Sequence, residues 1–194
     1  MTCSIWLLSR VAVCLLTMKL KGAIHIILWS LLLLLVPCCT GDKAAGRVAI
    51  GEPIPDFRYE DITGIRGSLG ELKGRVVLLR FWADWCPYCK FEMPRINLFY
   101  QRLKNKGFDV VAVNVGQTRD VVEAFTAQLS LSYQMVMDPD GKVARTYGVK
   151  GIPTNFLIDR AGIVREILVG EIFIEDRVLE DLLRPYFPDA TLSP

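Results

Sequence analysis

Apolar residues in the middle of the chain fall into short runs separated by a stretch of helical spacing. The run Val76–Leu79 is rich in β-branched residues and indicates a buried strand, and Phe108–Val115 has the same character. Between them, from Pro87 to about Lys106, the spacing is helical, and Pro94 within it predicts a kink. A strand, a helix and a second strand therefore follow one another.

Three further helices and a hairpin are predicted after Val115. Asp120 is expected to cap one helix, and an amphipathic helix from about Ile174 to Leu183 ends before Pro185. Between them, the strands Thr154–Ile158 and Ile163–Val169 flank a turn at 159–162 and predict a β-hairpin. The first helix has Val121, Val122, Phe125 and Leu129 on one face. It is followed by an extended segment at 135–137, a turn at 138–141 and a small helix.

The order of these elements predicts an α/β fold. Counted from Val76 it is β-α-β-α-β-β-α, which gives a central mixed β-sheet flanked by helices on both faces. Before Val76, prolines within Gly51–Phe57 and the glycines Gly64, Gly67 and Gly70 indicate short strands and a turn. The sheet is therefore expected to carry an N-terminal β extension.

The N-terminal apolar stretch has the layout of a secretory signal. Lys19 and Lys21 precede the apolar run Ile24–Val36, which is short for a membrane-spanning helix. Met18 stands directly before these lysines, so we expect translation to start there; a longer signal anchor is the alternative. The expected organisation is a leader at 1–41, a linker at 42–47, a folded domain at 48–188 and a tail at 189–194.

Cys38 and Cys39 form a candidate lipidation site directly after this stretch. Leu35 lies three residues before Cys38, as in bacterial lipoprotein signals, whereas Pro37 directly before it fits poorly. Cys39 is the competing choice. The alternative is that both cysteines belong to a leader that carries no lipid.

Composition and charge argue against nucleic-acid binding and against a metal site. The 194 residues are 52% hydrophobic, which fits one globular domain and an export segment. Twenty-three basic residues against 21 acidic ones leave no nucleic-acid footprint. The single histidine, His25, lies in the leader, so no metal site is expected.

Cys86 and Cys89 stand two residues apart at the predicted junction of the first strand and helix. Unpaired N–H groups and the helix dipole favour a thiolate there, which lowers the pKa of Cys86. Cys89, one turn later, can attack a mixed disulfide on Cys86 and release a reduced substrate. Pro87 suits the first helical turn. We therefore predict a redox-active dithiol with a reachable Cys86 and no other cofactor.

Other interpretations of this pair have less support. A zinc site normally includes a second cysteine pair or two histidines, and a static disulfide across so short a loop constrains the unfolded chain little. A peroxidase signature needs proline and threonine where the chain has Leu79 and Ala83.

These motifs, taken in order, resemble a known family. Trp85–Cys89 after the first core strand and Gly151–Thr154 before the hairpin are similar to the thioredoxin fold. Over residues 50–184 the chain resembles the exported TlpA/ResA-type thiol:disulfide oxidoreductases. The segments that carry this resemblance are Gly51–Phe57, Leu72–Leu79, Phe81–Ala83, Glu92–Pro94 and Phe156–Arg160.

The resemblance assigns roles to particular residues. Cys86 is the attacking thiolate and Cys89 the resolving thiol, while Glu92 matches a family acid that donates or accepts a proton; a solvated helix carboxylate is the alternative. Ile152-Pro153 matches the family's cis-proline turn, which offers a backbone edge to a substrate peptide, with a trans proline as the alternative. The implied substrate-binding residues are Trp85, Pro87, Tyr88, Ile152 and Pro153, and Trp82 is interpreted as core.

Two positions depart from the family pattern. Arg80 stands where thioredoxins carry a buried aspartate and many relatives an asparagine. It could favour the Cys86 thiolate, pair with a carboxylate or reach solvent. Pro87-Tyr88 differs from the pattern with proline just before the second cysteine and is similar to the glutaredoxin dipeptide. These two residues tune the reduction potential, so the direction of electron flow stays open.

The resemblance implies a bacterial protein in the periplasm or on the outer face of the membrane, attached by its leader or a lipid. Members take electrons from a membrane donor of the disulfide-reductase type and reduce disulfides in exported proteins, including apocytochromes c. A disulfide oxidase or isomerase and a glutathione-linked glutaredoxin are the enzymatic alternatives. A binding module or chaperone that uses Trp85 and Tyr88 is the non-catalytic one.

Overall fold

The computed structural model describes residues 48–171 and 178–188. Met18, Cys38, Cys39, the linker at 42–47 and the tail at 189–194 lie outside the described residues, as does the predicted start of the last helix at Ile174. Among the helices in the described ranges, none combines the length and the apolar character needed to cross a bilayer.

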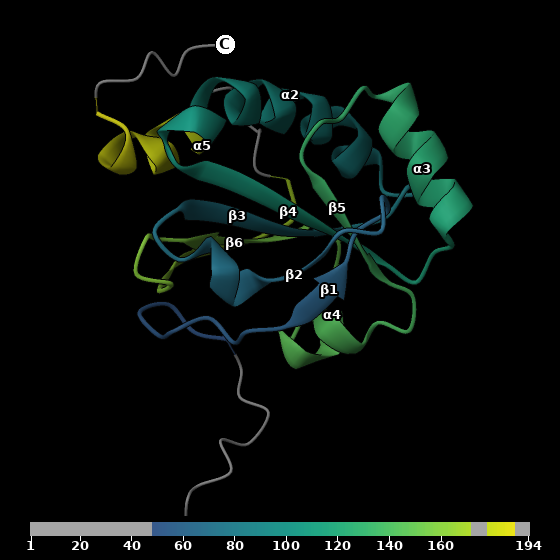
Figure 1. The fold of residues 1–194 in the computed structure, drawn as a ribbon, viewed down its shortest axis with the longest axis horizontal. Helices are drawn as coiled ribbons and strands as arrows, with labels where there is room; N and C mark the ends of the chain where they lie inside the picture. Colours follow the sequence, from purple (N-terminus) through teal and green to yellow (C-terminus); the bar gives the residue numbers. More distant parts are fainter. Residues whose placement is uncertain (1–47, 172–177, 189–194) are drawn as a thin grey trace, which may run out of the picture. The chain divides into compact units, whose positions relative to one another are not determined.

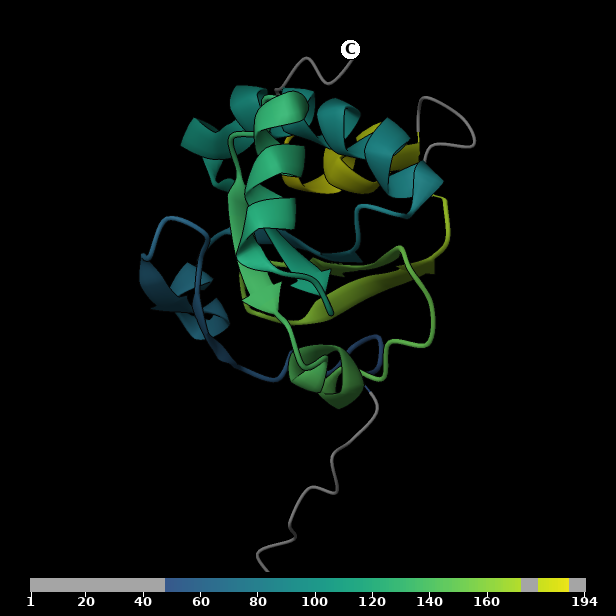
Figure 2. The same cartoon turned by 90° about the vertical axis from the view of Figure 1, so that its right-hand side faces the viewer.

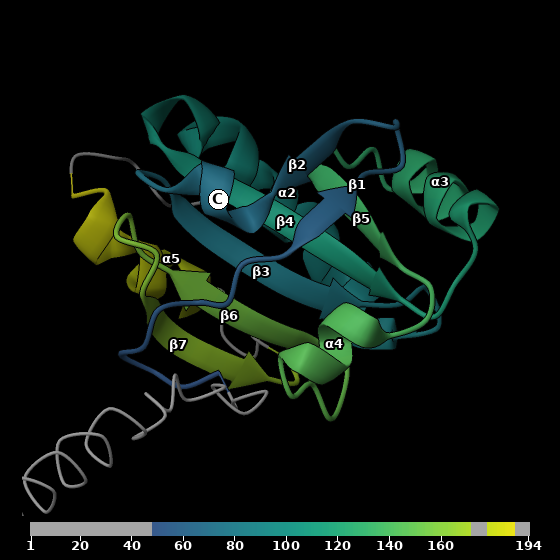
Figure 3. The same cartoon turned by 60° about the horizontal axis from the view of Figure 1, so that its bottom comes forward.

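A mixed β-sheet of five strands forms the centre of the domain. The strands are β3 (Val76–Trp82), β4 (Phe108–Val115), β5 (Gln134–Asp138), β6 (Thr154–Ile158) and β7 (Val164–Val169). They lie side by side in the order β5-β4-β3-β6-β7, as Figure 3 shows. β3 is parallel to β4 and antiparallel to β6, which confirms the mixed sheet. β5, expected only as an extended segment, adds an edge strand parallel to β4.

Helices cover both faces of this sheet, as predicted. They are α2 (Pro87–Leu103), α3 (Arg119–Gln128), α4 (Lys142–Thr146) and α5 (Val178–Leu183), and the turns η2 (Lys104–Lys106) and η3 (Arg184–Tyr186) follow α2 and α5. Side chains of α2, α3 and α5 pack with Val76 and Leu78 on one face. Ala144 of α4 packs on the other face with Val77 and Leu79 (Figures 1 and 2). Successive β3 residues thus serve two cores.

The predicted N-terminal β extension is present. It consists of β1 (Arg58–Glu60), β2 (Arg66–Ser68) and the turn η1 (Leu69–Leu72), and β1 and β2 form an antiparallel pair outside the central sheet. Upstream, the backbone N–H of Gly51 donates to the carbonyl of Val164 at 2.8 Å. Downstream, the N–H of Ile62 donates to the carbonyl of Met135 at 2.9 Å. The extension therefore contacts both edge strands, β7 and β5.

Two helix boundaries differ from the prediction. α2 begins at Pro87 as expected but ends at Leu103, with Pro94 inside it. Asp120 is not the cap of α3: Thr118 occupies that position, without a side-chain hydrogen bond, and Asp120 lies in the first turn. A carboxylate there interacts favourably with the positive end of the helix dipole. On the predicted apolar face, Val122 and Phe125 are buried, and Val121 and Leu129 are partly buried.

Candidate active site

The two cysteines lie where β3 passes into α2. Cys86, four residues after β3 ends at Trp82, is the N-cap of α2, and Pro87 is the first residue of the helix. The sulfur of Cys86 accepts the backbone N–H of Cys89 at 3.1 Å. The predicted nucleophile therefore stands at the positive end of the helix, where negative charge on sulfur is favoured.

Cys86 and Cys89 are joined by a disulfide, with their Cα atoms 5.2 Å apart. Cys86 is only 2% exposed and Cys89 is fully buried. The expectation that Cys86 is reachable is therefore wrong for the oxidised form, because its side chain packs into the hydrophobic cluster beneath α2. A partner must displace part of this cover to reach the sulfur.

The residues around the disulfide are exposed, in contrast to the cysteines. Trp85 is 67% exposed and Tyr88 50% exposed, and Pro87 between the cysteines is also exposed. Trp82 is fully buried and stacks on Phe125, with ring centroids 4.6 Å apart. The interpretation of Trp82 as core is confirmed, and Trp85, next to Cys86 in the chain, is exposed as a residue at the rim of the site would be.

The Ile152–Pro153 peptide bond is cis, as the resemblance implied. Ile152 packs against the hydrophobic cluster that includes both cysteines, and Pro153 is buried. The carbonyl of Pro153 accepts the N–H of Gly170 at 2.8 Å, which ties the turn to the end of β7.

Glu92 is fully buried, so it is not a solvated helix carboxylate. Its Oε2 lies 2.6 Å from Nη2 of Arg80 on β3, and neither side chain is exposed. The other terminal nitrogen, Nη1 of Arg80, donates to Oδ1 of Asn155 at 2.9 Å. Asn155 is the partner of Arg80 in the antiparallel register of β3 and β6. Of the alternatives left open for Arg80, the structure therefore has it paired with a carboxylate.

Tyr133 is a buried side chain on which the charge of Arg80 acts. Its hydroxyl donates to the carbonyl of Met93 on α2 at 3.2 Å. Burial raises the pKa of Tyr133, and the positive charge of Arg80 opposes that rise. Within residues 48–171 and 178–188, no group of three or more His, Cys, Asp or Glu side chains is placed to hold a metal ion.

A glutamine in the loop after β4 holds the segment before Cys86. Oε1 of Gln117 accepts the backbone N–H of Asp84 at 2.8 Å and Nδ2 of Asn114 at 2.7 Å. Nε2 of Gln117 donates to the carboxylate of Asp84. Neither Gln117 nor Asn155 belongs to a sequence pattern that would single it out, because only the fold brings them to the site.

Comparisons with known proteins agree with this geometry. Residues 50–167 match the model of the AhpC/TSA family. The chain is 39% identical over 129 residues to the thiol-disulfide oxidoreductase ResA of Geobacillus kaustophilus, which covers 66% of this chain and 74% of the relative.

Solved structures show the same relationship. A candidate thiol:disulfide interchange protein DsbE from Chlorobium tepidum is 38% identical, with a TM-score of 0.67 over 71% of this chain and 97% of that one. A candidate protein disulfide isomerase from Bacteroides thetaiotaomicron is 28% identical, with a TM-score of 0.63 over 72% of this chain and 89% of that one.

Proposed function

This chain belongs to the AhpC/TSA family and is a ResA-type thiol:disulfide oxidoreductase with a thioredoxin fold, and we propose that it reduces disulfides in exported proteins through Cys86 and Cys89. The observation that carries this proposal is the disulfide at the N-terminus of α2, where the sulfur of Cys86 accepts a backbone N–H. That position makes Cys86 the better thiolate and hence the nucleophile.

The proposed reaction consists of two thiol–disulfide exchanges. The Cys86 thiolate attacks one sulfur of the substrate disulfide, a mixed disulfide forms, and the other substrate sulfur leaves as a thiolate that takes up a proton. Cys89 then loses its proton and attacks Cys86, so that the Cys86–Cys89 bond forms and the second substrate sulfur leaves. Two electrons pass to the substrate, and the dithiol carries them without another cofactor.

We assign substrate binding to the exposed rim and the cis-proline turn. Trp85, Pro87 and Tyr88 present apolar surface beside the disulfide. Ile152 packs against the hydrophobic cluster that includes both cysteines, and Pro153 directly precedes β6, where an extended substrate peptide can align with backbone. A peptide that binds this rim is also the agent that displaces the cover over Cys86.

We place the reaction outside the cytoplasm. The signal-like run Ile24–Val36 supports export, and the leader or a lipid on Cys38 or Cys39 would attach the protein to the membrane. The substrates we propose are exported proteins with disulfides, apocytochromes c among them. Electrons would come from a membrane donor of the disulfide-reductase type.

Trapping of mixed disulfides tests this proposal. A Cys89→Ala variant of the full chain lacks the resolving sulfur, so substrates stay joined to Cys86. After acid quenching, we expect exported proteins in the adducts, with apocytochrome c among them. The matched Cys86→Ala variant, which keeps Cys89, should trap none. An adduct set made of cytoplasmic proteins, or equal trapping by both variants, would contradict the proposal.

The direction of electron flow is tested separately, because the solved relatives include a candidate isomerase as well. Thioredoxin-fold proteins span reduction potentials of about −270 to −120 mV, from reductants to oxidants. A reductase should lie near the negative end. A potential near the oxidising end, together with repair of scrambled disulfides, would favour the oxidase or isomerase.

A further inference from the structure

An ion pair is buried beneath the helix that carries the cysteines. Nη2 of Arg80 and Oε2 of Glu92 are 2.6 Å apart, and both side chains are fully buried. Asn155 accepts a hydrogen bond from Arg80 at 2.9 Å and so fixes the guanidinium on β3. Charges removed from water act on their neighbours more strongly than surface charges do. Each member of this pair can therefore influence a group that gains charge nearby.

We propose that Arg80 is a positioning residue that sets the reduction potential of the Cys86–Cys89 pair, by offsetting the negative charge that Glu92 brings next to the cysteines. The inference deepens the proposed function and rests on it, since a potential matters only for a disulfide that exchanges. Arg80 acts through Glu92 and the thiolate, not by contact with substrate.

The placement of both charges supports this role. Glu92 follows Cys89 by three residues on α2, and side chains at that spacing are neighbours on a helix. Arg80 belongs to β3, the strand that leads to Cys86. Both cysteines are buried, which limits screening by water. The positive charge of Arg80 also acts on Tyr133, whose pKa it lowers against the larger rise caused by burial.

The two charges have opposite effects on the reduced form. Two electrons and one proton convert the disulfide into a Cys86 thiolate and a Cys89 thiol, with two glutathione molecules as the donor. A nearby cation stabilises this thiolate and the reduced form, whereas a nearby anion destabilises both. In the intact pair the effects offset each other. Removal of one partner leaves the other uncompensated.

Three variants of the full chain, equilibrated with glutathione, test the inference. Arg80→Gln leaves Glu92 uncompensated, and we expect the equilibrium to shift about tenfold toward the disulfide, equal to about 30 mV for two electrons. Glu92→Gln leaves Arg80 uncompensated, and a similar shift toward the dithiol is expected. The double variant should return to within about threefold of the wild type, because it contains neither charge.

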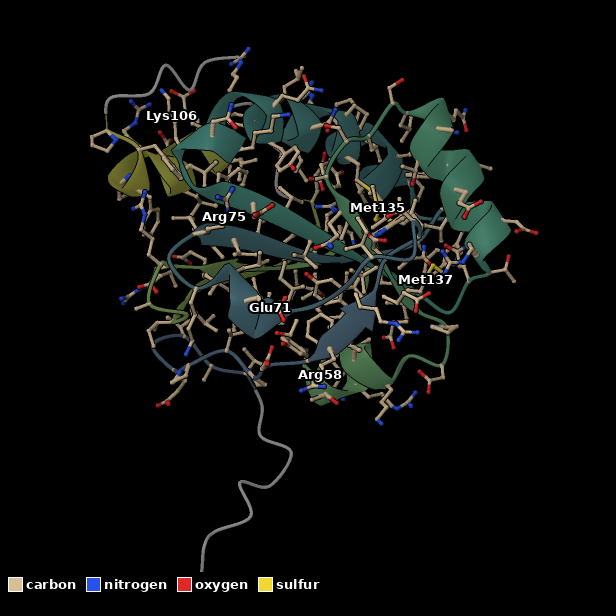
Figure 4. The ribbon with its side chains drawn as sticks, in the orientation of Figure 1. Arg58, Glu71, Arg75, Lys106, Met135 and Met137 are labelled. Carbon is tan, nitrogen blue, oxygen red and sulfur yellow. A yellow bond between two sulfur atoms is a disulfide. The ribbon has the colours of Figure 1, made fainter. Side chains whose placement is uncertain are left out.

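Two further variants separate charge from packing. Arg75→Gln is the matched control: Arg75, labelled in Figure 4, directly precedes β3 and pairs with Asp109 at 2.6 Å, whereas the cysteines follow the other end of that strand. This variant loses an arginine and an ion pair, and its thiol–disulfide equilibrium should not change. Arg80→Lys keeps the charge and should stay within about threefold of the wild type.

The inference is overturned if Arg80→Gln and Glu92→Gln shift the thiol–disulfide equilibrium in the same direction, or if neither variant shifts it. If Arg80→Gln does not fold, Glu92→Gln and the double variant decide, because the double must reverse the shift of Glu92→Gln. A wild-type disulfide that never exchanges with glutathione would contradict the proposed function instead.

Discussion

At the scale of single residues, the contact between Arg80 and Glu92 limits what the acid can do in the reaction. Protonation of this carboxylate would leave a buried guanidinium without its counter-ion, which is costly. Both roles expected for Glu92, donor and acceptor of a proton, pass through the protonated carboxylate and carry this cost, so both remain predictions.

Replacement of Glu92 by glutamine should slow the second exchange. Cys89 would lose its proton to water instead of a fixed carboxylate, so we expect resolution of a mixed disulfide to slow by about tenfold or more. The unpaired Arg80 should also move the alkylation profile of Cys86 to lower pH. Single-turnover kinetics and alkylation across a pH series measure the two effects. An unaltered pH–rate profile would leave Glu92 with a structural role only.

The tryptophans on either side of the junction should respond differently to truncation. Trp82→Ala removes a fully buried ring packed on Phe125 and should lower the free energy of unfolding by about 3–5 kcal/mol. Trp85→Ala removes an exposed ring, so stability should change by less than about 0.5 kcal/mol while kcat/KM for a peptide disulfide falls. Urea denaturation and exchange kinetics separate the two effects. A Trp85→Ala variant as unstable as Trp82→Ala would refute the assignment.

The contacts of Asp159 predict that the stability of the fold depends on pH. Its Oδ1 accepts the N–H groups of Ala161 and Ile163 at 2.9 and 3.0 Å, and its Oδ2 pairs with Arg165 at 2.6 Å. Burial raises the pKa of Asp159, but the hydrogen bonds and the Arg165 charge outweigh it and hold the pKa below its ordinary value. The ionised carboxylate therefore stabilises the fold above the unfolded-state pKa of about 3.9, and this contribution is lost as pH falls through the folded-state pKa.

Asp159→Asn should accordingly cost about 1–2 kcal/mol near neutral pH and progressively less below about pH 4. Urea unfolding of both proteins over a pH series checks this. An equal cost at acidic and neutral pH would show that the carboxylate charge is not what stabilises the turn.

At the scale of elements, we predict that the loop between β3 and α2 limits access to the disulfide. Gln117 bonds the backbone of Asp84 in this loop and is itself held by Asn114 at the end of β4. The buried Cys86 follows two residues after Asp84. We therefore expect opening of this loop to help a reductant reach the sulfur.

Gln117→Ala should speed reduction of the disulfide. Loss of hydrogen bonds worth about 1 kcal/mol would raise the open population of the loop about fivefold, and the rate with dithiothreitol should rise accordingly. Gln128→Ala, at an exposed position at the end of α3, is the matched control and should react as the wild type does. Reduction that is unchanged or slower in Gln117→Ala would show that the loop does not limit access.

Elements bounded by clear turn signals could be predicted from the sequence almost to the residue. β4 and β6 agree with their predicted bounds because each is a short apolar run. Asp120 and Thr118 are both able to cap a helix, and the path of the loop decides between them. The Arg80–Asn155 contact depends on strand register, and the burial of Cys86 on tertiary packing. Sequence periodicity specifies neither of these.

At the scale of the whole domain, the N-terminal extension contacts both edges of the central sheet. Its first segment bonds β7 through Gly51, and its later segment bonds β5 through Ile62. Unpaired edge strands invite association with other chains, so covering them is a common protective feature. Side chains of the extension also fill the core on the face opposite the cysteines: Val48, Ile54, Phe57 and Tyr59 pack there.

Phe57 therefore offers a test of whether the extension and the sheet unfold as one unit. Its ring packs edge-on against Tyr147 at 5.7 Å between centroids and lies beside Tyr59. Phe57→Ala should lower the free energy of unfolding by about 2–3 kcal/mol in a single transition, since the ring is partly buried.

Native-state hydrogen exchange gives the decisive measurement for that variant and the wild type. In one cooperative unit, the amides of Gly51 and Ile62 exchange with the same free energy as those of β3, and Phe57→Ala lowers both together. Disulfide exchange by the folded variant should match the wild type, because the cysteines belong to the other core. If amides of the extension exchange far faster than those of β3, the extension unfolds independently of the sheet. Phe57→Ala would then leave the exchange of the sheet amides unchanged.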